Sequence, residues 1–392
     1  MAEATAPGTA IVGLGMVGFT REYTESADAL AARALRLALE DSGLTKDDID
    51  GLQINGDPFS RKGLSMELQG FLGLRDLRLL TQPEGYGSTA TQMLQFASLA
   101  IRAGLASVVA CVFADTPSGG DQRAFTGDMS RVPAGMAGLP MAYGLFGAPA
   151  AYAMACRRHM ALYGTTSDHL ASIAVSNRKW AVLNPFAVFK EPLGYEEYHA
   201  SRWVVEPFHL VDCCMPVNGA IVVIVTSAER ARDLRQPPVY ILGMGQGHPG
   251  NPRRAGFECE VNTGAAIARD TCLGMAGIKA TDIDVCEFYD PFTYVTLVTL
   301  EDYGFCEKGE GGAFVSDGKL EPGGSLPTNT SGGQVSGYYM QGMTPISEAV
   351  IQARGQAGDR QAPKRDAILV TGSGGILDYH SCAIVSPHPS LR

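Results

Sequence analysis

The sequence predicts an α/β protein built from two similar halves, and three observations lead to this fold class. A segment of the first half recurs in the second, short apolar stretches alternate with helical patterns, and glycine-rich turns separate them. With 392 residues and 47 glycines, the chain is long enough for two domains or one large unit with an insertion. Strand–helix alternation predicts a mostly parallel sheet in each half, and we expect two sheets side by side around shared helices.

The internal repeat relates residues 31–50 to residues 265–284. At a shift of 234 positions, 8 of these 20 positions are identical, where average composition gives roughly one or two. Each copy is typical of a helix that ends at a glycine and is followed by an acidic turn leading into a strand. Upstream of each copy, a short apolar strand (10–16 and 239–245) is expected to break into a glycine turn.

The repeat divides the chain into an N-terminal half, residues 1–235, and a C-terminal half, residues 236–392. The first half is longer, and the surplus fits an insertion at about residues 116–200 that is rich in Gly, Pro, Met and aromatic residues. Such a stretch is typical of a loop domain that shapes a substrate site.

Composition and charge exclude several function classes. A formal charge of −10 and the lack of a basic stripe argue against a nucleic-acid partner. Nine cysteines without a CxxC pair predict reduced thiols and no metal site. No signal-peptide pattern and no apolar run of roughly 18–20 residues occur, so we expect a cytoplasmic protein without a membrane span.

Two glycine-containing segments of the first half admit more than one interpretation. Residues 13–18 match G-x-G-x-x-G after a strand, which leaves a dinucleotide-binding dehydrogenase as an alternative. However, residues 19–26 separate this motif from the next helix, and a similar glycine run at 243–247 favours a structural role. Ser88 opens a long helix that runs to Ala103, and it is either a nucleophile or, more commonly at such a position, a helix N-cap.

Three polar loops of the second half follow strands or open helices, which is where α/β proteins build their sites. The first carries Tyr289 and Asp290, the second spans residues 326–342, and the third spans residues 372–380. Each loop alone is weak evidence for a site. Tyr289 could be a core residue, Asp290 a helix N-cap, and His380 a buried structural imidazole. Together the three loops predict a site.

These loops also carry a resemblance to a known family. The strings YDPFT, LEDYGFCEKGEGGAF, LPTNTSGG and TGSGGILDYHS, with VDCCMPVNGA at 211–220, resemble the lipid-transfer-protein-type branch of the thiolase superfamily. The resemblance covers nearly the whole chain. It implies a thiolase-like fold of two pseudo-two-fold-related βαβαβ-type halves with a loop-domain insertion in the first half.

The departures from the thiolase pattern carry the functional argument. The position of the thiolase nucleophilic cysteine matches Gly87, and that of the second cysteine matches Gly372. Without a thiolate no acyl-enzyme forms readily. The positions of two thiolase histidines match Tyr289 and Tyr339, with the neighbouring Tyr338 left open and the Gly-Gly-Gln spacing favouring Tyr339.

This combination resembles the steroid side-chain-cleaving aldolases, which work with a small partner carrying a DUF35 domain. The resemblance implies retro-aldol cleavage of a β-hydroxyacyl-CoA, with Tyr289 as base and Tyr339 as acid. A free tyrosine has a pKa of about 10, so the site has to lower it or use the pair in concert. Six further residues are expected in the oxyanion and substrate loops: Gly87, Ser88, Asn329, Gly374, Gly375 and His380.

The same resemblance implies an acyl-CoA substrate, no redox cofactor or metal, and a homodimer that binds two DUF35 partners as a heterotetramer. Two rival functions stay open. One is an acyl-CoA acyltransferase that uses Ser88 or an unusual cysteine, and the other is a non-catalytic acyl-CoA-binding or scaffold protein. Candidates for holding the coenzyme phosphates are Arg157, Arg158, Arg178 and Lys179.

Overall fold

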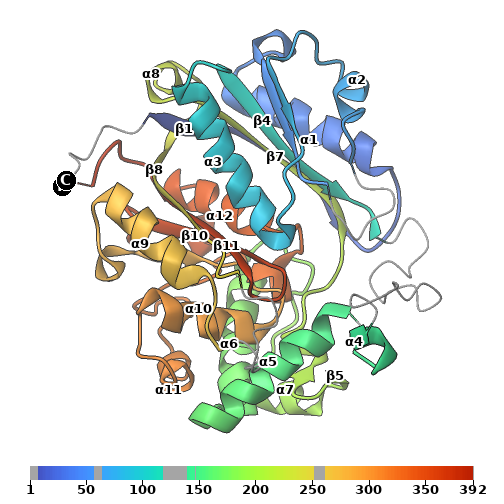
Figure 1. Cartoon of the computed structure of the whole chain (residues 1–392), viewed down its shortest axis with the longest axis vertical. Coiled ribbons are helices and arrows are strands. Elements are labelled where there is room, and N and C mark those ends of the chain that lie inside the picture. Colours follow the sequence, from blue (N-terminus) through green and yellow to red (C-terminus); the bar gives the residue numbers. More distant parts are fainter. Residues whose placement is uncertain (1–7, 57–63, 118–138, 146, 251–260, 392) are drawn as a thin grey trace.

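The computed structural model describes residues 8–56, 64–117, 139–145, 147–250 and 261–391 (Figure 1). Its strands are β1 (Thr9–Thr20), β2 (Gly51–Ile54), β3 (Leu79–Thr81), β4 (Val108–Asp115), β5 (Trp203–Val205), β6 (Phe208–His209), β7 (Asn218–Ser227), β8 (Val239–Gly247), β9 (Val285–Glu287), β10 (Ile368–Gly374) and β11 (Tyr379–Ser386). Its α-helices are α1 (Ala27–Ser42), α2 (Leu68–Leu72), α3 (Thr89–Arg102), α4 (Leu139–Ala142), α5 (Gly147–Tyr163), α6 (Ser167–Leu183), α7 (Tyr195–Ala200), α8 (Ala228–Ala231), α9 (Ala265–Ala276), α10 (Thr293–Tyr303), α11 (Gly311–Val315) and α12 (Met343–Ala353).

The described strands form one nine-stranded sheet in the order β3-β2-β4-β7-β1-β8-β11-β10-β9, and a two-stranded sheet, β5-β6. The α/β class is confirmed, but the prediction of two separate sheets is wrong. Strand β1 pairs with its counterpart β8 at Ala10–Tyr240 and Ile11–Val239. Without this pairing each strand would have an edge of unpaired backbone N–H and C=O groups at the centre of the molecule.

The sheet is mixed rather than mostly parallel. Within the first half β2, β3 and β4 are parallel, but β7 enters between β4 and β1 and runs antiparallel to both. In the second half β11 lies in the same way between β8 and β10, antiparallel to both. Strand β11 follows β10 through a loop of only four residues, 375–378. So short a connection allows an antiparallel return and no crossover.

Helices cover the sheet in layers because side chains alternate between its faces. On β4, Val109, Cys111 and Phe113 join a central core with α3 and α12. The intervening residues Val108 and Ala110 join an outer core with α1. A second outer core lies between α9 and the strands of the second half. The central helices α3 and α12 contact strands of both halves, as the prediction of shared helices required.

The two copies of the repeat form the same local structure. Helices α1 and α9 both end at a glycine in the left-handed region, Gly43 (φ 79°) and Gly277 (φ 70°). The repeated aspartates also make equivalent hydrogen bonds. Asp50 accepts from the N–H groups of residues 107 and 108 at the start of β4, and Asp284 accepts from the N–H of Ala367 just before β10. The boundary predicted between residues 235 and 236 falls between α8 and β8 and stays a prediction.

The glycine runs do not form turns as expected, but lie inside β1 and β8. A Cβ atom on Gly15 would lie 1.9 Å from the Ala34 carbonyl oxygen of α1, and one on Gly245 would lie 2.1 Å from the Ala268 carbonyl oxygen of α9. Glycine therefore allows a helix backbone to approach the strand closely in both halves. This packing explains the G-x-G-x-x-G motif without a dinucleotide.

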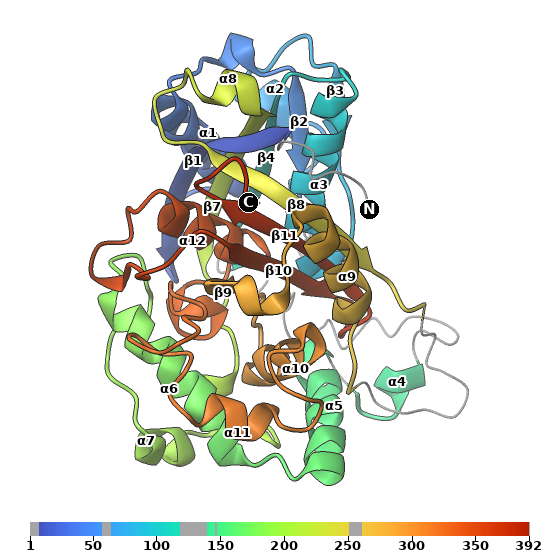
Figure 2. The same ribbon diagram turned by 90° about the vertical axis from the view of Figure 1, so that its left-hand side faces the viewer.

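Helices α5, α6 and α7 lie at one end of the molecule beside α10 and α11 (Figure 2). They belong to the part of the chain predicted as an insertion, of which residues 118–138 and 146 lie outside the described residues. Helix α6 packs on α10 and on the loop that precedes α12. No helix among the described residues is both long and apolar enough to cross a membrane.

Candidate active site

A tight turn, Tyr86–Ser88, precedes α3 and lies against the end of β10. Ser88 is fully buried; its hydroxyl donates to the Gly85 carbonyl oxygen at 2.7 Å and accepts from the Gln92 amide at 3.0 Å. It occupies the N-cap position of α3 but caps no helix N–H. A buried hydroxyl without a neighbouring base is poorly suited to be a nucleophile.

Tyr289 follows β9, and its ring lies directly over Gly87. A Cβ atom on Gly87 would lie 2.1 Å from Cζ of Tyr289 and 2.3 Å from the Ser373 carbonyl oxygen. No side chain fits at position 87 without displacing the phenol. The space that a nucleophilic side chain would need at this turn is therefore filled by Tyr289.

Tyr339 meets Tyr289 from the short segment between the π-helical turn Gly333–Gly337 and α12. The two hydroxyl oxygens lie 3.2 Å apart, within hydrogen-bonding reach. The two rings come from different loops, and Tyr289 is 6% exposed while Tyr339 is partly exposed. The neighbouring Tyr338 points elsewhere: it stacks on Phe19 and bonds to the Ser347 hydroxyl at 3.0 Å. Of the two adjacent tyrosines, therefore, Tyr339 is the one whose hydroxyl lies next to that of Tyr289.

The glycines of the third loop pack the end of β10 onto the turn below Tyr289. A Cβ atom on Gly372 would lie 2.8 Å from the Gly87 carbonyl oxygen, and one on Gly374 would lie 2.2 Å from the Gly85 carbonyl oxygen. Gly375 begins the hairpin loop with a positive φ of 61°. The structure thus brings Gly87, Ser88 and Gly374 together next to Tyr289, with Gly375 one residue further along.

Asn329 and Asp290 support the two tyrosine loops from below. The Asn329 carbonyl of the side chain accepts the Phe288 N–H at 2.7 Å, and its backbone adopts a positive φ of 53°. Asp290 is fully buried and accepts hydrogen bonds from the Gln334 N–H and the Asn177 amide, both at 2.8 Å. Burial raises the pKa of Asp290 to about 8, and these hydrogen bonds offset part of that rise.

Sequence reasoning considered Asp290 only as an N-cap, and that interpretation is wrong because Phe292 holds the N-cap position of α10. It assigned no role to Asn177 or to Gln334. Asn177 lies 113 positions from Asp290, and no sequence pattern predicts that α6 reaches the end of β9. The one available signal was the acidic residue directly after Tyr289 in YDPF.

His380 does not join the tyrosines. It pairs across the hairpin with Ser373, whose side chain points away from the turn, and its Nε2 lies 3.0 Å from the Tyr303 hydroxyl. Its neighbour Ser381 faces the turn instead and donates to the Ser88 carbonyl oxygen. Burial lowers the pKa of His380 to about 3, so the ring is neutral at physiological pH. Strand alternation therefore places His380 on the face opposite to Ser381 and the turn, and its membership of the substrate loop stays a prediction.

The described cysteines are all free thiols, and Cys259 lies outside the described residues. Cys111 and Cys382 are strand residues, as expected. Burial raises the pKa of Cys111, and it raises the pKa of Cys214 well above the usual value. Such thiols stay protonated, and a protonated thiol is a poor nucleophile.

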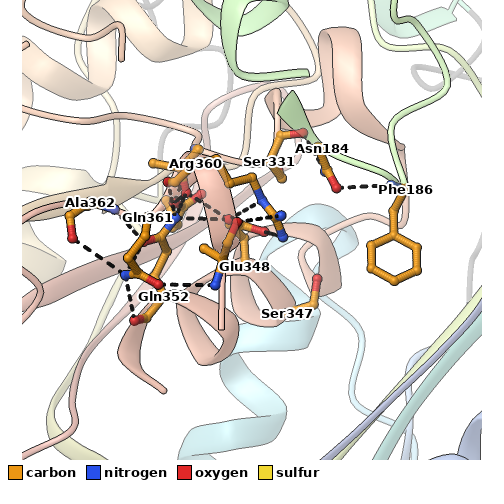
Figure 3. Close-up of polar contacts among 12 residues, drawn as sticks. Asn184, Phe186, Ser331, Ser347, Glu348, Gln352, Arg360, Gln361 and Ala362 are labelled. Carbon is orange, nitrogen blue, oxygen red and sulfur yellow. Dashed lines mark hydrogen bonds and ion pairs between the residues drawn. The ribbon is translucent and has the colours of Figure 1, made fainter. Parts of the chain in front are cut away.

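A buried polar network supports the Tyr339 loop (Figure 3). Arg360 donates to both carboxylate oxygens of Glu348, at 3.0 and 3.2 Å. The Thr330 hydroxyl lies 2.7 Å from Glu287 and 2.9 Å from Glu348. One hydroxyl proton cannot serve both carboxyl groups, so the group without the arginine, Glu287, carries a proton. Burial, followed by the charge of Glu348, accordingly raises the pKa of Glu287 well above its usual value.

Two of the basic residues considered for coenzyme binding are engaged within the protein. Arg178 donates to the Ser336 hydroxyl and to the Glu191 carbonyl oxygen, and Lys179 pairs with Glu321. Arg157 is exposed and lies 3.5 Å from Glu206 at the rim of a shallow, mostly apolar groove along α5. Within the described ranges, no three His, Cys, Asp or Glu side chains are grouped so as to hold a metal ion.

Comparisons with known proteins agree with this geometry. Residues 258–387 match the family model for the thiolase C-terminal domain-like family. Over 389 residues the chain is 35% identical to the steroid side-chain-cleaving aldolase of Thermomonospora curvata, with 94% of this chain and 96% of that protein covered. The chain belongs to the thiolase superfamily.

Further relatives narrow the chemistry within this superfamily. The chain is 34% identical over 375 residues to the 17-hydroxy-3-oxo-4-pregnene-20-carboxyl-CoA lyase of Mycobacterium tuberculosis, covering 93% of this chain and 96% of the relative. The solved Ltp2-ChsH2(DUF35) aldolase superposes with a TM-score of 0.87 and 32% identity, over 98% and 99% of the two chains. A thiolase from Ascaris suum, at 13% identity and a TM-score of 0.68, shares the fold alone. This thiolase-superfamily chain is a carbon–carbon lyase.

Proposed function

We propose that this lyase is a retro-aldolase that cleaves a steroid β-hydroxyacyl-CoA, with Tyr289 as base and Tyr339 as acid. The observation that carries the proposal is the 3.2 Å contact between the two phenol oxygens above Gly87. Two relatives named for steroid side-chain and pregnene carboxyl-CoA cleavage support the substrate class. The Ser88 hydroxyl is buried, and desolvation raises the pKa of the Cys214 thiol well above its usual value, which supports a reaction without an acyl-enzyme.

The proposed reaction is balanced by moving two protons. Tyr289, as phenolate, takes the proton of the β-hydroxyl group, and the electrons of that O–H bond form the ketone. The carbon–carbon bond breaks, and its electron pair enters the thioester as an enolate. Tyr339 then protonates the α-carbon, which releases a shorter acyl-CoA. Tyr339 is left as phenolate and recovers a proton from Tyr289 across their hydroxyl contact, so the pair returns to its starting state.

The enolate oxygen needs hydrogen-bond donors for as long as it carries charge. We assign this role to the backbone N–H of Gly87 and to N–H groups at Gly374–Gly375, in the two segments that border Tyr289; the N–H of Ser88 already donates to the Gly85 carbonyl oxygen at 3.1 Å. Asn329 holds the strand end beneath them through the Phe288 N–H. The mechanism uses no redox cofactor and no metal; the CoA thioester is the substrate.

The proposed assembly is a homodimer that binds two DUF35 proteins, as a heterotetramer. The relative solved as an Ltp2-ChsH2(DUF35) aldolase supports the DUF35 partner. Support for the homodimer comes from strand β3, which lies at the end of the sheet order and whose outer edge pairs with no other described strand. Nearby on α3, Phe96 and Leu99 are 40% and 54% exposed. An apolar, unpaired edge of this kind favours association.

The experiment that tests the proposed function mixes the chain with a DUF35 partner and 17-hydroxy-3-oxo-4-pregnene-20-carboxyl-CoA. The expected result is a 17-ketone and a shorter acyl-CoA in equal amounts. An acyl adduct on the protein, detected by intact mass during turnover, would support the acyltransferase alternative and overturn this proposal. Binding of the thioester without any product would support a non-catalytic acyl-CoA-binding protein.

A further inference from the structure

We propose that Asp290 is a positioning residue whose buried carboxyl group fixes the distance between the two phenol hydroxyls. The proposal rests on the proposed function, because it presumes that the tyrosine pair moves the protons. Asp290 follows Tyr289 directly, so any bond to its carboxyl group restrains the Tyr289 backbone. None of its side chain is exposed to solvent.

The first contact of Asp290 joins the two tyrosine loops. One carboxyl oxygen accepts the backbone N–H of Gln334 at 2.8 Å, inside the π-helical turn Gly333–Gly337 that precedes Tyr338 and Tyr339. The approach is close: a Cβ atom on Gly333 would lie 2.2 Å from the other carboxyl oxygen. Gly333 also has a positive φ of 61°, so both space and backbone conformation require glycine there. The carboxyl group therefore links the loops at their bases.

The second contact ties both loops to helix α6. The other carboxyl oxygen accepts the Asn177 side-chain amide at 2.8 Å. Arg178 of the same helix donates to the Ser336 hydroxyl of the Tyr339 loop. Its C-cap residue, Asn184, donates to the Ser331 carbonyl oxygen of that loop (Figure 3). The helix thus acts as a fixed frame, and Asp290 is the group by which the Tyr289 loop is attached to it.

The groups that face Asp290 allow it to form the same hydrogen bonds whether its carboxyl group is ionised or protonated. Asn177 approaches from α6, Gln334 from the π-helical turn, Asn329 from the same loop and Cys214 from the segment before β7. No cation pairs with the carboxyl group among the ion pairs of the described residues. When Asp290 is protonated, the Asn177 amide can turn to accept its proton, while the other oxygen still accepts from Gln334. A neutral amide at position 290 can make the same two bonds.

This reasoning gives a pair of matched variants. Asp290→Asn keeps both hydrogen bonds, and we expect its kcat to stay within about threefold of the original. Asp290→Ala loses both bonds, and we expect kcat to fall by about 100-fold with KM little changed, since a misplacement of about 1 Å costs roughly that factor. A crystal structure of Asp290→Ala should show the two phenol oxygens further apart than the present 3.2 Å.

A second set of variants tests the partner. Asn177→Asp places two carboxyl groups face to face, and we expect a loss of kcat of about 10-fold. Adding Asp290→Asn to it restores one carboxyl and one amide with their places exchanged, and we expect kcat to recover. A purely structural effect would lower the yield and the melting temperature of all variants together and show no such recovery.

The experiment is steady-state cleavage of 17-hydroxy-3-oxo-4-pregnene-20-carboxyl-CoA by each variant with the DUF35 partner, alongside Tyr289→Phe and Tyr339→Phe. Retained activity in Asp290→Ala overturns the positioning role, and so does an Asp290→Asn variant as slow as Asp290→Ala, because the charge would then matter. If Asp290→Ala does not fold, the Asn177→Asp variant and its double mutant decide the question. Full activity in the two Tyr→Phe variants instead overturns the proposed function itself, which separates the two failures.

Discussion

The two halves of the molecule repeat the same architecture but contribute differently to the site. In each half a helix backbone packs closely against the glycines of a strand, and an aspartate accepts a hydrogen bond from the backbone at the start of a later strand. At the site, however, the first half supplies Gly87 and a buried serine, whereas the second half supplies both phenols. The comparison teaches that the first half provides space and backbone at the site, while the second half provides the two phenols to which the proposed mechanism assigns the proton transfers.

The largest expected loss of activity comes from removing the phenol hydroxyls, which tests whether the second half supplies the chemistry. Tyr289→Phe and Tyr339→Phe should each lower kcat by about 10²–10⁴-fold, the usual contribution of a general acid or base. The melting temperature should change little, because the rings stay in place. The measurement is steady-state cleavage with the DUF35 partner. Activity that survives both substitutions would show that the second half does not supply the chemistry.

The space supplied by the first half is tested next. Gly87→Ala places a methyl carbon against the Tyr289 ring, and we expect kcat to fall by about 100-fold or more and the free energy of unfolding to fall by about 1–3 kcal/mol. Gly87→Cys should behave alike and gain no acyl-transfer activity, since the thiol has no room.

The matched control for these variants is Gly274→Ala in α9, where an added Cβ meets nothing within 4 Å. Here we expect full activity and a gain of about 0.5–1 kcal/mol, because alanine is the better helix former. Equal effects at positions 87 and 274 would contradict the account of Gly87. Activity assays and denaturant unfolding of the three variants decide this.

A pH-dependent effect of intermediate size should come from His380. Its folded pKa of about 3 lies below the usual value of 6.5, so between these values the unfolded chain binds the extra proton. Stability contributed by the neutral ring is therefore present above pH 6.5 and is lost as pH falls, by about 1–2 kcal/mol between pH 6.5 and 5. His380→Gln should lack this part of the slope in unfolding curves and keep its kcat. An identical slope in both proteins would argue against a buried neutral ring.

The smallest effect should come from Tyr338→Phe, which separates the adjacent tyrosines. It removes a buried hydrogen bond to Ser347 and should cost about 1 kcal/mol of stability. Because the ring points into the core, kcat should be unchanged. A loss of activity as large as that of Tyr339→Phe would mean that the catalytic tyrosine is misassigned.

Much of the fold and part of the site could be predicted from the sequence. The repeat was identified from the identities at a shift of 234 positions, because the repeated residues end helices and precede strands, which are local roles. The meeting of Tyr289 and Tyr339 was expected only through the family resemblance, since 50 residues separate them. Local patterns predicted that the three polar loops form a site, but not which side chains within them come together.

Other features depend on register and long-range packing, which the sequence does not display. The side of β11 on which His380 lies is fixed by the pairing of Gly374 with Tyr379, and a shift of one residue would reverse it. Strand β7 lies between β4 and β1 in the sheet, and no local residue pattern predicts this order. The contact of Asn177 with Asp290 likewise exists only because α6 packs beside the site.

The most direct test of the central claim is hydrogen exchange at the α-carbon of the short acyl-CoA product. The complex is incubated with that product alone in D₂O, and deuterium in the acyl group is followed by mass spectrometry. If Tyr339 delivers and removes the α-proton, the original protein should catalyse exchange and Tyr339→Phe should not. Tyr289→Phe should exchange more slowly than the original protein, because Tyr339 then lacks the partner that takes its proton. Exchange that continues undiminished in Tyr339→Phe would contradict the assignment of the two phenols.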